Sequence, residues 1–167
     1  MGNERKTEDI IRDILKSNKE KFEANGGAVI IEEQKSDNPR ISKLLKHASK
    51  QGNADGKPEF LVSFPNKDML MVIECKADIN HHKSQTLDNP KDFAVDGVLL
   101  YSSYLSKEFD VIALGVSGES VAELQIDTYL QTRGEPSSRD LEIKKVYEFS
   151  DYASTSTPSS RENRNRV

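Results

Sequence analysis

Two apolar segments separated by one short polar turn constrain the fold of this chain most. Residues 59–64 and 69–76 consist largely of apolar side chains, and Pro65-Asn66-Lys67-Asp68 between them is typical of a turn. This pattern predicts a β-hairpin. If the turn is symmetric, Phe64 pairs with Met69, and each further pair lies one residue back on the first strand and one residue forward on the second.

The hairpin is expected to bring two acidic side chains together at its open end. Continuing the pairing sets Glu59 opposite Glu74, with Cβ atoms about 4.5–5.5 Å apart. Carboxylates at this spacing repel each other, and a hard divalent cation such as Mg²⁺ is a natural counterion. Because side chains alternate along a strand, Lys76 shares the face of Glu74, whereas Cys75 points to the other face and is expected in the core.

A cation, two carboxylates and a lysine suffice for phosphodiester hydrolysis. The cation polarises the phosphate, and Lys76 can orient the attacking water and place positive charge near the transition state. The competing interpretation is a surface hairpin with an ordinary cross-strand Glu–Lys pair. Both interpretations are open on the spacing alone.

The remaining segments predict helices and strands around this hairpin. Apolar residues at helical spacing predict a helix over about residues 8–18 with Thr7 as its N-cap, on which Glu8 shares the inward stripe. Two more helices are expected to begin at Asn38-Pro39, closing at Gly52, and at Asn89-Pro90. Strands are expected over residues 28–31, over 110–116 and, half-exposed, over 121–130, with a last strand or helix over 142–149. We therefore expect an α/β domain with a mixed central β-sheet flanked by α-helices.

Composition places these elements in one small domain. The chain has 167 residues, of which 35% are hydrophobic and 31% charged. No apolar run approaches the ~20 residues of a membrane span, and the N-terminus lacks the apolar stretch of a signal peptide. The single cysteine excludes an internal disulfide and a cysteine-based zinc cage. We expect a cytoplasmic protein with one domain over residues 1–150 and a disordered tail or linker over 151–167.

Charge is unevenly distributed along the chain. The net charge of −4 is not typical of a nucleic-acid binder, but residues 39–57 contain five lysines or arginines against one acid. Such a strip can contact phosphates, and an ordinary solvated helix face explains it equally well. The candidate DNA contacts are Lys43, Lys46, Lys50 and Lys57, followed after the hairpin by His82 and Lys83.

Some further residues have two interpretations. His81 and His82 invite a zinc site, but adjacent side chains diverge and no further histidine or cysteine lies near them in the sequence. Tyr101 is expected to pack in the core, with a polar role near the site as the alternative. Glu8 is an acid in a first helical turn, where it can simply serve the helix dipole.

The ordered set of motifs resembles one nuclease superfamily. Gly56-Lys-Pro-Glu-Phe60 followed by Val72-Ile-Glu-Cys-Lys-Ala77 looks like the PD-(D/E)xK signature. The likeness extends over roughly residues 6–132. It is carried by the flanking segments Glu33–Ser36, Ile41–Leu45, Ala48–Lys50, Ala94–Gly97, Phe109–Ile112 and Val116–Gly118. The chain most resembles the N-terminal endonuclease domain of type IIG restriction enzymes, which fuse a nuclease to an N6-adenine DNA methyltransferase.

This resemblance implies a restriction-endonuclease-like fold with a site for Mg²⁺, for which Mn²⁺ can substitute. It implies that Glu59 and Glu74 are metal ligands and that the carbonyl of Cys75 contributes. Lys76 would be the catalytic lysine and Glu8 a supporting acid. Glu59 is the main departure, since the superfamily more often has Asp at this position.

The resemblance also implies partners. The substrate would be double-stranded DNA in a prokaryotic cytoplasm, and double-strand cleavage would need a homodimer or two sequential nicks. No glycine-rich cofactor loop or Asn-Pro-Pro-Tyr motif is present in the sequence, so S-adenosylmethionine would belong to a methyltransferase region outside it. We therefore expect a standalone module or a fragment whose specificity domains lie elsewhere. The alternatives are a nuclease-like module that binds DNA or protein without cutting, and a nuclease of the same fold that acts on branched DNA or RNA.

Overall fold

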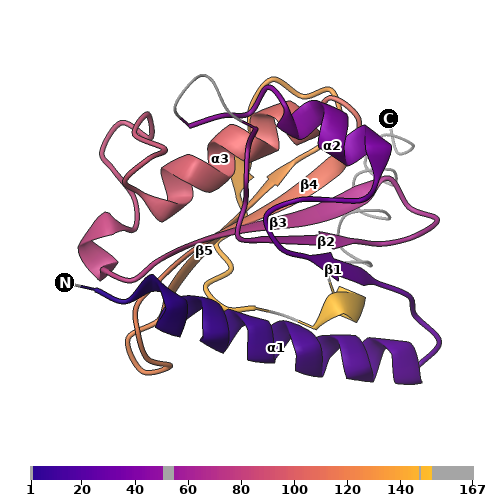
Figure 1. The fold of residues 1–167 in the computed structure, drawn as a ribbon, viewed down its shortest axis with the longest axis horizontal. Coiled ribbons are helices and arrows are strands. Elements are labelled where there is room, and N and C mark those ends of the chain that lie inside the picture. Colours follow the sequence, from indigo (N-terminus) through magenta and orange to yellow (C-terminus); the bar gives the residue numbers. More distant parts are fainter. Residues whose placement is uncertain (1, 51–54, 147, 152–167) are drawn as a thin grey trace.

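The computed structural model describes residues 2–50, 55–146 and 148–151. A mixed sheet of six strands in the order β1-β2-β3-β4-β5-β6 lies between helices (Figure 1), which confirms the predicted α/β architecture. The helices are α1 (Glu4–Ala24), α2 (Pro39–Leu45) and α3 (Ala94–Leu105), with a 3₁₀ turn η1 (Ile79–His81). The strands are β1 (Ile30–Glu32), β2 (Phe60–Ser63), β3 (Met69–Lys76), β4 (Asp110–Ser117), β5 (Gln125–Gln131) and β6 (Arg139–Asp140). None of the described helices has the length and apolar character needed to cross a membrane.

The central hairpin has the predicted register. β2 and β3 are antiparallel, and their pairing runs from Phe60 opposite Ile73 to Ser63 opposite Leu70, as a symmetric turn requires. β4 then pairs with β3 in parallel, and α3 provides the crossover between them. Glu59 therefore directly precedes β2 and stands beside Glu74 of β3.

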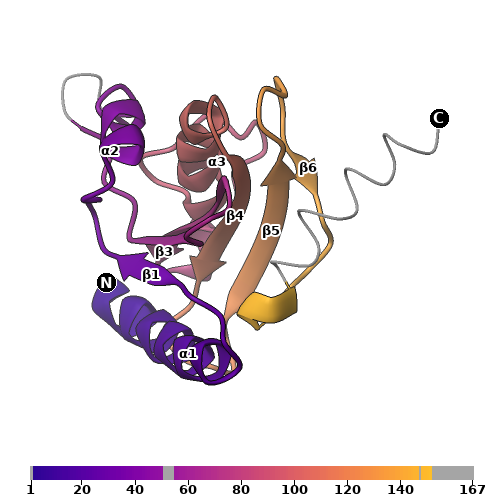
Figure 2. The same cartoon turned by 90° about the vertical axis from the view of Figure 1, so that its right-hand side faces the viewer.

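The two faces of the sheet carry separate cores. α1 covers one face and α2 with α3 covers the other, as Figure 2 shows. Alternation along β3 divides its side chains between them: Ile73 and Cys75 belong to the α1 side, and Val72 belongs to the α2–α3 side. The fully buried Cys75 is thus the core side chain that alternation predicts. On the other face, Gly115 lets α3 approach β4 closely, because a Cβ there would lie 2.9 Å from Cα of Val95.

α1 is longer than predicted at both ends. It begins at Glu4, and the side chain of Asn3 caps it by accepting from the backbone N–H of Arg5. The predicted cap Thr7 is wrong: it lies inside the helix, buried, and its hydroxyl donates to the carbonyl of Gly118 at 2.6 Å. The apolar stripe does not mark the true start, because the first turn is polar. The consequence is that Glu4 lies on the helix, one turn before Glu8.

The predicted helix start at Asn89-Pro90 is also wrong. α3 begins at Ala94, and the preceding loop is held by the buried carboxylate of Asp96. This carboxylate accepts from the backbone N–H groups of Ser84 at 3.1 Å and Asn89 at 2.9 Å. α2 begins as predicted, with Asn38 as its N-cap, but it ends at Leu45. Gly52, where the sequence predicted the end of this helix, lies outside the described residues.

The C-terminal part departs most from expectation. Residues 121–124 form a turn, and β5, which begins at Gln125, is buried apart from that first residue, so a half-exposed strand over 121–130 is wrong. The predicted last strand or helix over 142–149 is not formed as such: the described residues of 142–148 form neither, and one helical turn follows over residues 149–151. There Phe149 packs edge-on against Phe22 and Phe64, and the segment closes the α1 side of the core. The predicted tail beyond residue 151 lies outside the described part of the chain.

Candidate metal centre

The candidate site lies where the N-terminal end of α1 meets the ends of β3 and β4 (Figure 1). Besides Gly118, the hydroxyl of Thr7 reaches the carbonyl of Lys76, at 3.4 Å. Lys76 is the last residue of β3 and Gly118 directly follows β4, so the Thr7 side chain fixes the first turns of α1 against the ends of these strands. The acids on those turns are thereby brought to the open end of the hairpin.

Three carboxylates meet at this point. One oxygen from each of Glu4, Glu8 and Glu59 lies within 4.8 Å of the other two, and all three residues are partly buried. Among the described residues they are the one group of three acids, histidines or cysteines close enough to share a cation. Glu8 and Glu59 were predicted from the sequence and Glu4 was missed. Glu4 lies four residues before Glu8, a spacing that puts two side chains on the same side of a helix. This spacing could have identified Glu4 only if the helix had been predicted to begin there.

Glu74 lies beside this group and is almost completely enclosed. Its residue is 1% exposed, and its Oε1 accepts from the backbone N–H of Glu59 at 3.1 Å. Its Oε2 is paired with the ammonium of Lys50. The carboxylate of Glu59 gathers with the acids of α1, whereas that of Glu74 takes a lysine. The two predicted ligands are therefore adjacent, but they have different first partners.

Burial and like charge act together on these acids. Burial, followed by the charges of Glu74 and Glu8, raises the pKa of Glu59 to about 9. Burial also raises the pKa of Glu74, against the opposing effects of Lys50 and of the Glu59 amide. Such a site favours either protonation of a carboxylate or the arrival of a cation.

Lys76 ends β3 and is partly buried. Its positive charge lowers the pKa of Glu74, which places its ammonium within electrostatic reach of the site. The carbonyl of Cys75 as a metal ligand stays a prediction. The Cys75 thiol does not take part, because burial among apolar side chains raises its pKa and keeps it from acting as a thiolate.

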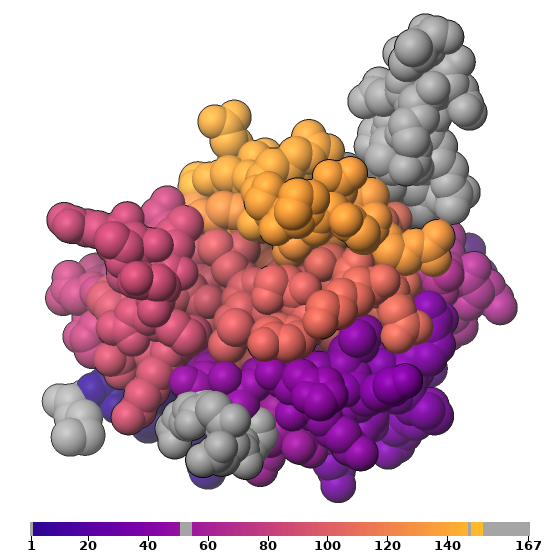
Figure 3. All heavy atoms as spheres, turned by 90° about the horizontal axis from the view of Figure 1, so that it is seen from above, coloured from indigo at the N-terminus to yellow at the C-terminus, as the bar shows by residue number. Residues whose placement is uncertain are grey.

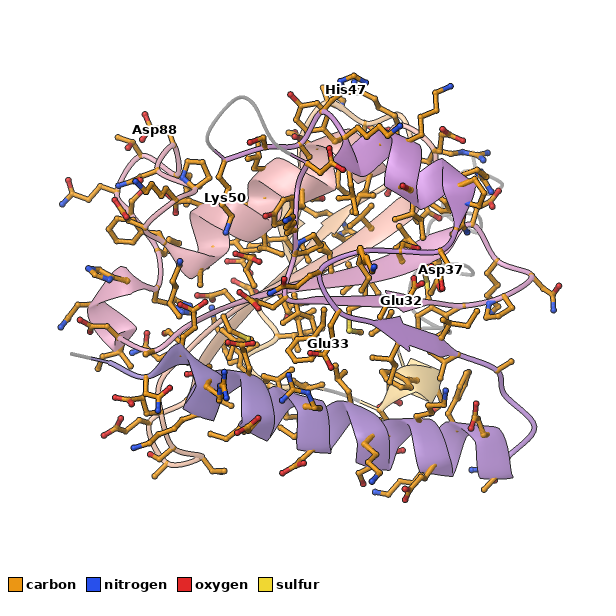
Figure 4. All side chains as sticks on the ribbon, in the orientation of Figure 1. Glu32, Glu33, Asp37, His47, Lys50 and Asp88 are labelled. Atoms are coloured by element: carbon orange, nitrogen blue, oxygen red, sulfur yellow. The ribbon has the colours of Figure 1, made fainter. Side chains whose placement is uncertain are left out.

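Lys50 is the site residue whose role the sequence missed. It was predicted as a phosphate contact, but it points from the connection after α2 toward the strands (Figure 4) and pairs with Glu74. Its ammonium lies 5.4 Å from the ring centroid of Tyr101, and a Cβ on Gly97 would lie 3.2 Å from it. Tyr101 is buried as predicted, and its hydroxyl accepts from the backbone N–H of Lys57 at 3.2 Å.

The other predicted DNA contacts divide into two groups. Four of them are exposed and stay predictions: Lys43, Lys46, Lys57 and Lys83. Lys43 lies on α2 and Lys46 directly follows it. α2 packs beside α3 on one side of the molecule (Figure 3). His82 does not fit the prediction, because it is buried and both of its ring nitrogens are engaged within the protein.

His82 instead belongs to an internal network. Its Nδ1 lies 2.8 Å from the hydroxyl of Ser117, and its Nε2 lies 2.7 Å from a carboxylate oxygen of Asp127. The other oxygen of Asp127 accepts from Lys144. These residue types also occur in nucleophilic triads, but Ser117 is 0% exposed and offers no access to a substrate. The network is therefore structural, and no local sequence pattern predicts it.

Comparisons with known proteins add no family to this description. No protein-family model, no curated protein and no solved structure matches the chain.

Proposed function

We propose that this chain is a Mg²⁺-dependent DNA endonuclease domain with a restriction-endonuclease-like fold of the PD-(D/E)xK type. The carrying observation is the hairpin register, which sets Glu59 against Glu74 beside the acids of α1, with Lys76 two residues further along β3. The resemblance to the nuclease domain of type IIG restriction enzymes points to the same residues. Under this proposal, sequence specificity comes from other domains of a restriction–modification protein.

The donor set suits a hard cation. Glu59 and Glu74 would hold Mg²⁺ or Mn²⁺, with Glu8 and Glu4 adding carboxylates from α1 and Cys75 its carbonyl. Charge supports this choice, since burial and neighbouring acids raise the pKa of Glu59 to about 9 and a cation would relieve that repulsion. When bound, the ion would polarise the scissile phosphate and lower the pKa of a nearby water.

Other residues of the chain would orient the attacking water and bind the DNA. Lys76 would orient the attacking water and stabilise charge as it develops on the phosphate oxygens. The exposed lysines on and after α2 would hold the DNA by its phosphates, so binding would weaken steeply with salt. Cleavage of both strands would follow from a homodimer or from two successive nicks.

A second candidate has one observation in its favour. Glu74 is buried and already paired with Lys50, which suits a nuclease-like module that binds DNA or a protein without cutting. The presence of Glu59, Glu74 and Lys76 together favours the nuclease. Cleavage assays separate the two candidates.

Plasmid nicking is the direct test. We expect the purified chain to nick supercoiled plasmid with Mg²⁺ or Mn²⁺, and Glu74→Ala and Lys76→Ala each to lower the rate by at least ~100-fold. Glu20→Gln, which changes an exposed acid at the far end of α1, is the matched control and should cut like the parent. A parent that binds DNA at low salt but never nicks it supports the silent module. Nicking that survives both substitutions places the active centre elsewhere.

A further inference from the structure

Both carboxylate oxygens of Glu74 are taken by groups of the protein itself. Oε1 accepts the backbone N–H of Glu59, and Oε2 is paired with Lys50, whose side chain is 17% exposed. The second partner comes from a distant part of the chain, because Lys50 lies in the connection after α2, 24 residues before Glu74. A buried carboxylate needs such a partner, since leaving its charge uncompensated is costly.

The ammonium of Lys50 sits in a niche shaped for it. The Tyr101 ring lies under it, with 5.4 Å between the ammonium and the ring centroid, a favourable cation–π distance. On α3, Gly97 leaves the necessary space, since a Cβ there would lie 3.1 Å from Cε and 3.2 Å from Nζ of Lys50. The contact between Lys50 and Glu74 is thus supported from two sides.

We propose that Lys50 is a built-in counterion, which compensates Glu74 until a divalent cation arrives and then gives up its place. This inference rests on the proposed function. A cation that takes Glu74 as a ligand needs the oxygen on which the ammonium now lies, and two positive charges at one carboxylate repel each other. Lysine suits a replaceable partner, because its single charge sits on a flexible four-carbon stem without the bidentate fork of arginine.

Release of Lys50 would have a second effect. Its ammonium could then turn from Glu74 toward a phosphate of the bound DNA, beside the exposed lysines of α2. Lys50 would thus be a positioning residue that couples cation binding to DNA binding. If instead Lys50 were a fixed structural partner, its removal would weaken the cation site or leave it unchanged.

Calorimetric titration of the DNA-free protein with Mn²⁺ tests the proposal without relying on cleavage. Lys50→Gln removes the competing charge and keeps a hydrogen-bond donor. We expect its Mn²⁺ dissociation constant to fall by about tenfold, equivalent to about 1.4 kcal/mol. We also expect a lower melting temperature without metal and a larger rise on adding Mn²⁺. Gly97→Ala keeps the lysine and crowds its ammonium, and its Cβ would also lie 3.0 Å from the carbonyl oxygen of Pro90. It should tighten Mn²⁺ binding in the same direction.

Two matched controls isolate the contact. Lys107 also lies over a tyrosine ring, 4.9 Å from the centroid of Tyr104, but pairs with no site acid, so Lys107→Gln should bind Mn²⁺ like the parent. Lys57→Gln removes an exposed positive charge from a residue whose backbone N–H contacts Tyr101, and it measures the effect of losing one lysine charge without losing the Glu74 contact.

The outcomes separate this inference from the function on which it rests. Equal or weaker Mn²⁺ binding by Lys50→Gln, or an equal gain in Lys57→Gln, overturns the role of Lys50 and leaves the metal centre standing. Absence of Mn²⁺ binding in the parent and in every variant removes the metal centre itself. Tighter binding confined to Lys50→Gln and Gly97→Ala supports the counterion.

Discussion

Burial and neighbouring negative charges both raise the pKa of Glu59. Burial, together with the carboxylates of Glu74, Glu8 and Glu4, raises its pKa to about 9. The group therefore binds a proton more tightly in the folded chain than in the unfolded one, where a glutamate titrates near 4.5. A cation at the site would replace that proton, so pH and metal should act on the same carboxylate.

The raised pKa of Glu59 makes the stability of the fold depend on pH. Between about pH 5 and about pH 9 the folded chain retains a proton that the unfolded chain has lost, so stability falls as pH rises through this window. Glu59→Gln cannot lose that proton, and we expect it to flatten the decline and to raise the melting temperature at pH 8. Thermal unfolding at several pH values without metal measures this. A parent whose melting temperature rises from pH 6 to pH 9 would contradict the assigned pKa of Glu59.

At the scale of elements, the boundaries of α1 determine which acids enter the site. Its apolar stripe was predictable, because Ile11 and Leu15 repeat with helical spacing and are buried. Its beginning was not, because the cap Asn3 and the polar first turn carry no periodic signal. Thr7 shows the same limit: its hydroxyl serves a tertiary contact with Gly118, and a side chain that can cap a helix can also do this.

Thr7→Val tests how α1 is fixed to the sheet. The substitution keeps the side-chain shape but leaves the carbonyl of Gly118 without its donor, so we expect a loss of about 1–3 kcal/mol in unfolding free energy. Looser seating of Glu4 and Glu8 should also weaken Mn²⁺ binding. Urea unfolding and metal titration measure the two effects. Ser17→Ala on the exposed side of the same helix is the control, expected within about 0.5 kcal/mol of the parent. Equal stability of Thr7→Val and Ser17→Ala would argue against this attachment.

For the whole molecule, what could be predicted depends on how far apart the interacting residues are in the sequence. The hairpin register was predictable, since a four-residue turn leaves little freedom and places Glu59 beside Glu74. The pairs Lys50–Glu74 and His82–Asp127 span 24 and 45 residues. No local period encodes such contacts; they depend on how α3 and β5 pack on the sheet. For this reason the sequence offered no basis for separating the exposed lysines from the buried His82, and all were predicted as DNA contacts.

The network around Asp127 joins three distant parts of the chain, so its loss should loosen the segments that it connects. Its carboxylate accepts from His82 after η1 and from Lys144 in the C-terminal segment, and it belongs to β5. Asp127→Asn removes the charge that both partners bond, and we expect a loss of about 2–3 kcal/mol in unfolding free energy. Because His82 also contacts Ser117, we expect faster amide exchange near the ends of β4 and β5 and over residues 141–146. Asp13→Asn, an exposed acid on α1, serves as the control for removing one negative charge. If exchange in Asp127→Asn speeds up uniformly along the chain, or at these segments no more than in Asp13→Asn, the network does not hold the C-terminal segment to the sheet.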